Sequence, residues 1–269
     1  MILDNIVKLN NLNFDYGGRT VIKDLSLDIK KGQVVAIMGG SGVGKTTILR
    51  LIAGLRISKK NQVYAFNEDI SKLNPKSLNN LRKKMGFLFQ FGALFTDLSC
   101  FENVAFPIRE HLKLPESVIR DIVMIKLEFV GLRGAANLMP SEISGGMSRR
   151  VALARAIALE PELILYDEPF AGLDPISLGM TARLIRKLND SLGATSILVT
   201  HDVAETFEIA DKVFLLSSTD SGAVLVSSGT PRELKNDESE LVQQFLNGDV
   251  EGPIKFHYPS KPIETFFEK

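Results

Sequence analysis

The stretch from Val34 to Leu55 constrains the fold of this chain more than any other part of the sequence. The apolar run from Val34 to Met38 predicts a buried strand. The run Gly39-Gly40-Ser41-Gly42-Val43-Gly44-Lys45-Thr46 that follows fits the pattern G-x-x-x-x-G-K-[ST]. From Thr47 onward, apolar residues recur with the spacing of an α-helix. This strand–loop–helix order predicts a phosphate-binding loop, in which backbone N–H groups and the helix N-terminus surround phosphate oxygens.

The residues of this loop have expected roles in binding a nucleoside triphosphate. Lys45 is expected to reach the β- and γ-phosphates, and the Thr46 hydroxyl is expected to ligate Mg²⁺. A glycine-rich turn without a ligand is the alternative, and the flanking strand and helix disfavour it. The predicted nucleotide contacts are Gly39, Gly40, Ser41, Gly42, Val43, Gly44, Lys45, Thr46 and Thr47.

Composition excludes some functional classes. Lys+Arg and Asp+Glu are equal at 32 each, which disfavours a strongly basic surface, so we expect no nucleic-acid partner. A single cysteine, Cys100, cannot form an internal disulfide. No apolar run approaches the roughly 20 residues that a membrane-spanning helix needs. If the chain serves a membrane, we expect another chain to provide the spanning part.

Strand and helix patterns alternate along most of the chain. Residues 1–33 read as short strands with turns, and the buried type of strand recurs at Met85–Phe89, Leu163–Tyr166 and Ser196–Thr200. Residues 91–160 read as a mostly helical insert. The alternation predicts an α/β fold with a largely parallel central sheet.

Two carboxylates follow the strand Leu163–Tyr166. Ligands of open α/β sheets bind at the carboxyl ends of strands, so Asp167 and Glu168 should face the phosphate-binding loop. Asp167 is suited to hold Mg²⁺, directly or through a water molecule, and Glu168 to orient and deprotonate an attacking water. A solvated turn is the alternative for an isolated Asp-Glu pair, but the complete loop upstream favours the site.

Three more side chains are candidates, each with a simpler alternative. Gln90 ends a strand, where its amide could touch Mg²⁺ or the attacking water, although a lone glutamine usually has no such role. His201 follows a strand in the same way and could hydrogen-bond the γ-phosphate, or else cap the next helix. Tyr16 could stack on a purine base or pack locally as an edge-strand residue.

A second anion-binding pattern lies far along the chain. Ser144-Gly145-Gly146 heads a helix rich in Ala, Leu and Arg, and glycine N–H groups at a helix start can hold a phosphate. Because the loop at 39–46 already serves the nucleotide of this chain, the simplest explanation is that residues 144–146 bind the nucleotide of another copy. We therefore expect an ATP-dependent dimer with two composite sites.

Taken together, these motifs resemble those of the nucleotide-binding subunits of ABC transporters, over residues 5–235. Two departures concern the signature sequence LSGGQ: Ile143 replaces its leucine, and Met147 replaces its glutamine, which removes one possible polar contact to the nucleotide of the other copy. The corresponding positions are Tyr16 (A-loop), 39–46 (Walker A), Gln90 (Q-loop), 144–148 (signature), 163–168 (Walker B), 172–174 (D-loop) and His201 (switch histidine).

The resemblance implies a fold and an activity. The fold would be a P-loop NTPase core with a mainly parallel sheet, an antiparallel β subdomain and a helical subdomain. The activity would be hydrolysis of ATP with Mg²⁺. Residues 1–247 would form the ATPase domain, with the helical subdomain at about 91–160. Alternatives are a soluble ABC protein of DNA repair or translation, and a P-loop kinase, which would not need residues 144–146.

Shorter segments point to one group of transporters. The stretches FGALFTDLSCFENVAFPIREH, LMPSEISGGMSRR and GPIKFHYP are similar to those of the Mla (toluene-tolerance type) phospholipid transport ATPases. This similarity implies a peripheral protein on the cytoplasmic side of the inner membrane. Its partners would be permease subunits, an MCE-domain lipid-binding protein and a STAS-domain protein. The cargo would be phospholipid, moved between the inner and outer membranes to keep outer-membrane lipid asymmetry; another ABC transporter substrate is the alternative.

Aromatic residues suggest where partners dock. Phe91, Phe95 and Phe101 could line a groove for a permease helix, although such rings also fill helical cores. The tail 248–269 carries four aromatic residues, and we expect it to dock on a neighbouring subunit, either the second ATPase copy or the STAS-domain partner.

Overall fold

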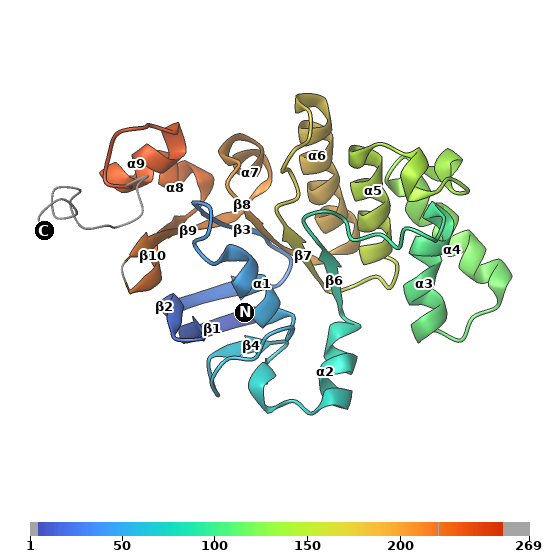
Figure 1. Cartoon of the computed structure of the whole chain (residues 1–269), viewed down its shortest axis with the longest axis horizontal. Helices are drawn as coiled ribbons and strands as arrows, with labels where there is room; N and C mark the ends of the chain where they lie inside the picture. The colour runs from blue at the N-terminus through green and yellow to red at the C-terminus, as the bar shows by residue number, and fades with distance from the viewer. Residues whose placement is uncertain (1–4, 220, 255–269) are drawn as a thin grey trace, which may run out of the picture.

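The computed structural model describes residues 5–219 and 221–254, and a ten-stranded sheet forms the centre of that part (Figure 1). Its strand order is β5-β4-β1-β2-β10-β9-β3-β8-β7-β6. The strands are β1 (Asn5–Tyr16), β2 (Arg19–Lys30), β3 (Val34–Gly39), β4 (Val63–Ala65), β5 (Glu68–Asp69), β6 (Met85–Leu88), β7 (Leu163–Asp167), β8 (Thr195–Thr200), β9 (Lys212–Thr219) and β10 (Gly222–Gly229).

Helices cover the sheet and extend beyond one of its edges (Figure 1). No helix in the described residues is both long enough and apolar enough to span a membrane. The α-helices are α1 (Lys45–Ile52), α2 (Pro75–Arg82), α3 (Cys100–His111), α4 (Glu116–Phe129), α5 (Gly145–Ala156), α6 (Pro175–Leu192), α7 (Val203–Ile209), α8 (Pro231–Lys235) and α9 (Glu240–Asn247).

The side of the sheet from β9 to β6 is parallel, as the sequence predicts. β3 pairs in parallel with both β8 and β9, and β7 pairs in parallel with β8 and β6. Every residue of β3, β7 and β8 is buried. Parallel strands covered by helices on both faces are buried along their whole length in this way.

The antiparallel side contains longer strands than the sequence suggests. β1 and β2 each have 12 residues and pair with each other, where the sequence predicts short strands. Register shifts such as the one between Leu9 and Leu12 let the pairing continue past polar residues that look like breaks. A single parallel pair, Ala223 with Ile22, joins β10 to β2.

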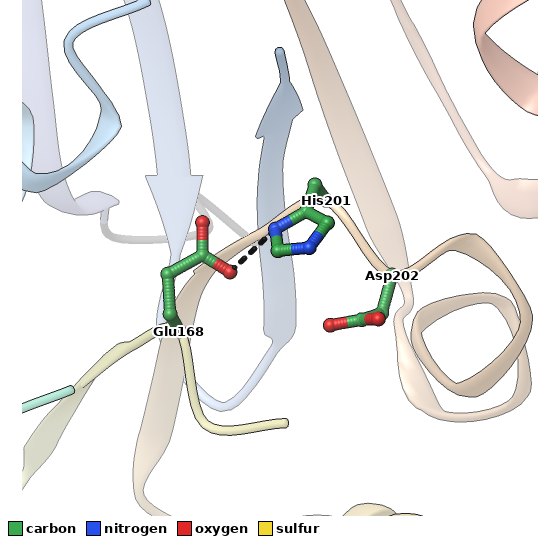
Figure 2. A group of neighbouring side chains, drawn as sticks. All are labelled: Glu168, His201 and Asp202. Atoms are coloured by element: carbon green, nitrogen blue, oxygen red, sulfur yellow. Dashed lines mark hydrogen bonds and ion pairs between the residues drawn. The ribbon is translucent and has the colours of Figure 1, made fainter. Parts of the chain in front are cut away.

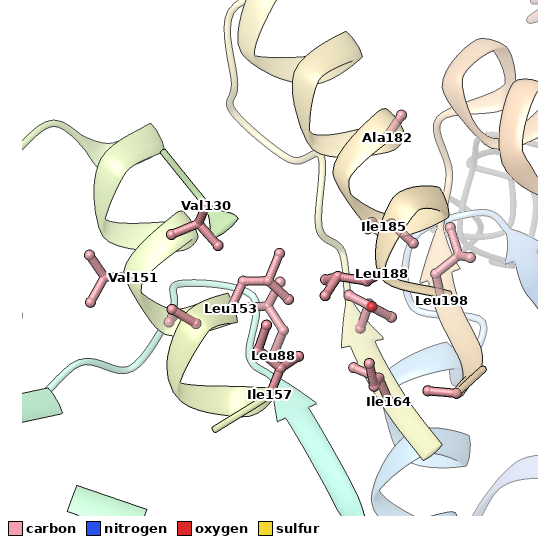
Figure 3. Close-up of a cluster of buried hydrophobic side chains, with 14 of the residues drawn as sticks. Leu88, Val130, Val151, Leu153, Ile157, Ile164, Ala182, Ile185, Leu188 and Leu198 are labelled. Carbon is pink, nitrogen blue, oxygen red and sulfur yellow. The ribbon is translucent and has the colours of Figure 1, made fainter. Parts of the chain in front are cut away.

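Two apolar cores form on opposite faces of the sheet, and successive residues of β3 alternate between them. Val35 and Ile37 pack in the core that contains Ile48 and Leu49 of α1. The core on the other face contains Leu153 of α5 and the α6 side chains Ile185 and Leu188, with strand residues such as Leu88 and Ile164 (Figure 3). The two cores hold α1 and α5 in fixed positions relative to the strand ends.

Residues 91–160 contain α3, α4, α5 and two short 3-10 helices, at Arg133–Ala135 and Pro140–Glu142. The aromatic rings of this segment divide between surface and interior. Phe91 and Phe95 are 82% and 42% exposed, whereas Phe101 packs against the core. Phe91 and Phe95 are therefore available on the surface to a partner, together with Phe106, which is 44% exposed.

Gly86 in β6 allows the closest approach between this strand and the end of α5. A Cβ atom at residue 86 would lie 2.5 Å from the Ala156 carbonyl oxygen. We expect Gly86→Ala to lower the free energy of unfolding by about 1–3 kcal/mol, because backbone must shift to relieve the overlap. Urea denaturation would measure it. The control Gly134→Ala adds a methyl group where no atom lies within 4 Å, and equal effects of the two substitutions would contradict the prediction.

Candidate nucleotide-binding site

Four adjacent parallel strands bring most of the candidate residues to one edge of the sheet. In the order β3, β8, β7 and β6, their carboxyl ends lead into the loop at 39–46, His201, Glu168 and Gln90. Asp167 is the last residue of β7. The carboxyl edge of such a sheet is where open α/β folds bind ligands, so the topology supports one shared site.

The loop between β3 and α1 has a backbone shape that depends on glycine. Gly39 has a φ of +151°, and a Cβ atom there would lie 2.6 Å from the Leu216 carbonyl oxygen. Gly44 has a φ of +94°, and its Cβ would lie 2.9 Å from Val21 Cγ1. Gly40, Ser41 and Gly42 are exposed, whereas the side chains of Val43 and Thr47 are buried. The exposed part of the loop can therefore present its backbone to a ligand.

Lys45, the first residue of α1, lies inside this loop and is only 6% exposed. Its Nζ donates to the Gly39 carbonyl at 2.7 Å and to the Gly40 carbonyl at 3.1 Å. The same nitrogen lies 3.3 Å from Glu168 Oε1. Desolvated charges need such partners. A phosphate group would compete with Glu168 for this ammonium group.

Thr46 and Asp167 meet at the mouth of the loop. The Thr46 hydroxyl donates to Asp167 Oδ1 at 2.7 Å, and Asp167 is 4% exposed. Burial raises the pKa of Asp167 above its ordinary value, and the hydrogen bond from Thr46 partly offsets this. A hydroxyl and a carboxylate are oxygen ligands of the kind that Mg²⁺ prefers, so these two residues fit a magnesium site.

Glu168, His201 and Asp202 form a cluster beside Lys45 (Figure 2). His201 Nδ1 lies 3.0 Å from Glu168 Oε2, and one side-chain atom from each of the three residues lies within 4.8 Å of the other two. The glutamate carboxylate thus lies between an ammonium group and an imidazole. Sequence reasoning missed Asp202, although it directly follows His201.

The backbone of Glu168 is strained. Its φ is +48°, which is uncommon for a residue with a side chain and costs about 1–3 kcal/mol. The Glu168 N–H donates to the Val199 carbonyl at 2.9 Å, and its carbonyl accepts from the Ala171 N–H at 3.3 Å. This conformation directs the carboxylate toward both Lys45 and His201, and strain of this kind is typical of functional sites.

Tyr16 and Gln90 stand apart from this cluster. Among the described residues, neither has a hydrogen bond or ion pair to Lys45, Asp167 or Glu168. Tyr16 ends β1, is 38% exposed, and packs edge-on against Phe14 at 5.1 Å between ring centroids. The Arg56 guanidinium lies 5.6 Å from the Tyr16 centroid. Gln90 is half-buried, two residues beyond the end of β6.

Residues 144–146 lie far from the phosphate-binding loop of the same chain. They begin α5, with the Ser144 hydroxyl accepting from the Met147 N–H at 3.2 Å. α5 packs along β6, and β7 and β8 separate β6 from β3, so α5 lies well to one side of α1 (Figure 1). At about 4.8 Å per strand, this separation prevents residues 144–146 from sharing a phosphate with Lys45 of the same chain.

The family model described as "ABC transporter" matches residues 22–171, and the chain belongs to this family. It is an ATP-hydrolysing transport ATPase of the ABC type. Across 98% of its length it is 50% identical to the intermembrane phospholipid transport system ATP-binding protein MlaF of Haemophilus influenzae, covering 99% of that protein. It is 47% identical to MlaF of Escherichia coli strain K12, over 95% of this chain and 94% of the relative.

Solved structures agree with this assignment. The cbiO1 protein of Clostridium perfringens, part of the ABC transporter complex cbiONQ, has a TM-score of 0.79 at 30% identity, over 90% of this chain and 95% of that one. The ATP-binding cassette MJ0796, a dimer in a post-hydrolysis state bound to ADP and Pi, has a TM-score of 0.75 at 32% identity, over 84% of this chain and 99% of that one. The predicted ABC ATPase fold is therefore confirmed.

The cluster around Glu168 yields a direct test. We expect Glu168→Gln to lower ATP hydrolysis by about 10²- to 10⁴-fold, because the amide cannot accept the proton of water, while nucleotide binding is retained. Phosphate release and binding of a fluorescent ATP analogue would measure the two effects.

Glu160→Gln is the matched control, because Glu160 also has a positive φ, +51°, and pairs with a buried lysine, Lys126, at 2.9 Å. Residual hydrolysis in Glu168→Gln equal to that of this control would disprove the proton-accepting role.

Met147, which replaces the glutamine of the family signature, faces the interior of its own chain. Its side chain is half-buried and packs against the core that contains α5. We expect Met147→Gln to leave hydrolysis no faster and to lower the free energy of unfolding by about 1 kcal/mol. Steady-state ATPase assays and urea denaturation would test this, with Met147→Leu as the apolar control. A clear rise in hydrolysis would show that residue 147 reaches nucleotide.

Proposed function

We propose that this chain is the ATP-hydrolysing subunit of a transporter that moves phospholipids between the inner and outer membranes and so maintains outer-membrane lipid asymmetry. The observation that carries the proposal is 50% identity, over nearly the full length of both chains, to an ATP-binding protein of intermembrane phospholipid transport. The cluster of Lys45, Thr46, Asp167, Glu168 and His201 supplies the chemistry.

Each residue of the cluster has a step in the proposed mechanism. Lys45 exchanges Glu168 for phosphate oxygens and neutralises part of their charge. Glu168, released from the ammonium group, accepts a proton from the attacking water. His201 holds Glu168 through Nδ1 and contacts the γ-phosphate with the rest of its exposed ring. Mg²⁺ would be held by Thr46 and Asp167, with the Gln90 amide as a further proposed ligand, and would offset the negative charge of the phosphates.

A second copy of the chain completes the site in this proposal. Ser144, Gly145 and Gly146 would bind the nucleotide held by the loop at 39–46 of that copy. The separation of α5 from α1 across β7 and β8 supports this, because one chain cannot bring both to one phosphate. The dimeric state of MJ0796 bound to ADP and Pi supports it further. Tyr16, at the end of β1, would stack on the base.

The remaining proposals concern partners and place. The chain would bind peripherally, on the cytoplasmic side of the inner membrane, to permease subunits, in a complex with an MCE-domain lipid-binding protein and a STAS-domain protein. The exposed rings of Phe91 and Phe95 support a contact with a permease helix close to Gln90. We place the ATPase domain at residues 1–247 and the helical subdomain at about 91–160.

The start of the tail is held against α9. The Gln244 side chain accepts from the Ile254 N–H at 2.7 Å and donates to the Ile254 and Asp249 carbonyls at 3.3 and 3.2 Å. These bonds hold residues 249–254 against α9 of the same chain, and we propose that the tail 248–269 docks on a neighbouring subunit. The four aromatic residues that motivate this proposal lie outside the described residues.

A second cargo has some support. The chain is 40% identical, over 92% of its length and 70% of the relative, to a probable ribonucleotide transport ATP-binding protein of Mycobacterium leprae. An ABC transporter of another substrate is therefore the alternative, and a cargo assay separates the two.

That assay uses the chain assembled with its membrane partners in vesicles that contain a fluorescent phospholipid. We expect ATP to drive transfer of the phospholipid to acceptor vesicles, and Glu168→Gln in the same complex to abolish transfer. The control Glu160→Gln should transfer normally. ATP hydrolysis with no phospholipid movement in either direction would contradict the proposed cargo and favour the alternative.

A further inference from the structure

Arg155, in the last turn of α5, is a half-buried cation without an acidic partner among the described residues. None of the ion pairs formed by residues 5–219 and 221–254 includes Arg155. Burial lowers the pKa of its guanidinium from the ordinary value. A desolvated charge is unfavourable unless dipoles or rings surround it, and the helix C-terminus supplies only part of that stabilisation. The other partners of Arg155 therefore indicate what it does.

These partners all belong to the segment that follows Gln90. Arg155 Nη2 donates to the Gly92 carbonyl at 2.7 Å, and Nη1 donates to Asn103 Oδ1 at 3.3 Å. The guanidinium lies 5.6 Å from the centroid of the Phe95 ring. Hydrogen bonds to a charged group are the stronger kind, and the planar guanidinium makes two in one orientation.

Asn103 extends this connection. It is fully buried in α3, accepts from the Phe95 N–H at 2.9 Å, and donates to the Phe95 and Leu98 carbonyls, both at 3.0 Å. Gly92 also sits directly on α5, since a Cβ atom there would lie 3.3 Å from Ala152 Cβ. The loop 92–98 is thus fixed to α5 by Arg155 and to α3 by Asn103.

The two ends of α5 serve different parts of the proposed mechanism. Its first residues, with Ser144, are proposed to contact the nucleotide of the second copy. Through Arg155, its last turn contacts Gly92, which lies two residues after Gln90, and the ring of Phe95. The exposed Phe95 ring also packs on Phe106, with 4.8 Å between the ring centroids. The neighbouring arginines of α5 reach elsewhere: Arg149 bonds the Pro169 carbonyl and Arg150 the Val130 carbonyl.

We propose that Arg155 is a positioning residue that makes the loop 90–98 move as one body with α5. Nucleotide contact at residues 144–146 then displaces Gln90 and the partner-facing ring of Phe95 together. The inference rests on the proposed function for the contact between copies. It adds the residue through which that contact reaches Gln90.

Hydrogen exchange on the full-length chain tests this proposal. Each variant carries Glu168→Gln, so that bound ATP persists, and exchange is compared with and without MgATP. In the parent, which carries Glu168→Gln alone, we expect ATP to slow exchange at 39–47, at 144–148 and at 90–98. Arg155→Lys keeps the charge but cannot make both hydrogen bonds of the guanidinium. The factor by which ATP slows exchange at 90–98 should therefore be about tenfold smaller than in the parent, which is the size expected for one hydrogen bond to a charged group. Slowing at 39–47 and 144–148 should remain.

Arg150→Lys is the matched control, since it removes a comparable bond from the same helix to a carbonyl outside the loop, and it should behave like the parent. An unchanged ATP response at 90–98 in Arg155→Lys would overturn the proposal. So would faster exchange spread evenly through α3 and α4 in both nucleotide states, because that pattern marks a purely structural role.

If Arg155→Lys does not fold, Phe95→Leu keeps the proposal testable. It removes the ring beside the guanidinium at a half-exposed position and should weaken the ATP response at 90–98 while sparing 39–47; an unchanged response would overturn the proposal.

Failure of the proposed function has a different signature. Absence of any ATP response at 144–148 in the parent would argue against contact between copies, and absent phospholipid transfer would argue against the cargo. The exchange result for Arg155 requires no lipid, so an inactive transfer assay with the expected exchange pattern leaves the role of Arg155 intact.

Discussion

The parallel hydrogen-bonded ladder of β3, β8, β7 and β6 is the constraint on which the candidate site depends. Parallel pairing makes all four strands end at the same edge of the sheet. Because β3, β7 and β8 are completely buried, a shift in their pairing register would be strongly unfavourable. Residues more than 100 positions apart, such as Thr46 and Asp167, are thereby held at hydrogen-bonding distance. The chemistry is thus a consequence of strand order as much as of residue choice.

At this edge, the side chains of the candidate site are arranged in a series. Lys45 contacts Glu168, Glu168 contacts His201, and Asp202 lies alongside (Figure 2). The strained backbone of Glu168 turns its carboxylate toward both neighbours. In the proposed mechanism, a phosphate takes over the ammonium group of Lys45, and nucleotide binding thereby frees the Glu168 carboxylate for proton transfer.

Much of this arrangement could be predicted from local sequence. The phosphate-binding loop, the strand before Asp167 and the position of His201 after a strand are short-range patterns that do not depend on the rest of the fold. The ion pair of Lys45 with Glu168, the positive φ of Glu168 and the contacts of Arg155 could not be predicted, because they join segments that are distant in the chain. The length of β1 and β2 was also hidden, since bulges are invisible in an alternation pattern.

The single residue pair between β10 and β2 has a mechanical consequence. It divides the sheet into a part from β10 to β6, which is parallel except for the pair of β10 with β9 and leads into Lys45, and an antiparallel part from β5 to β2, which carries Tyr16. Few backbone bonds cross this line, and the two parts are joined there mainly by the apolar core that contains Ile22, Ala223 and Phe214. If Tyr16 stacks on the base, a bound nucleotide spans the line and fastens the two parts together. Bound ATP would then stabilise the contact between the two parts of the domain that hydrolyses it.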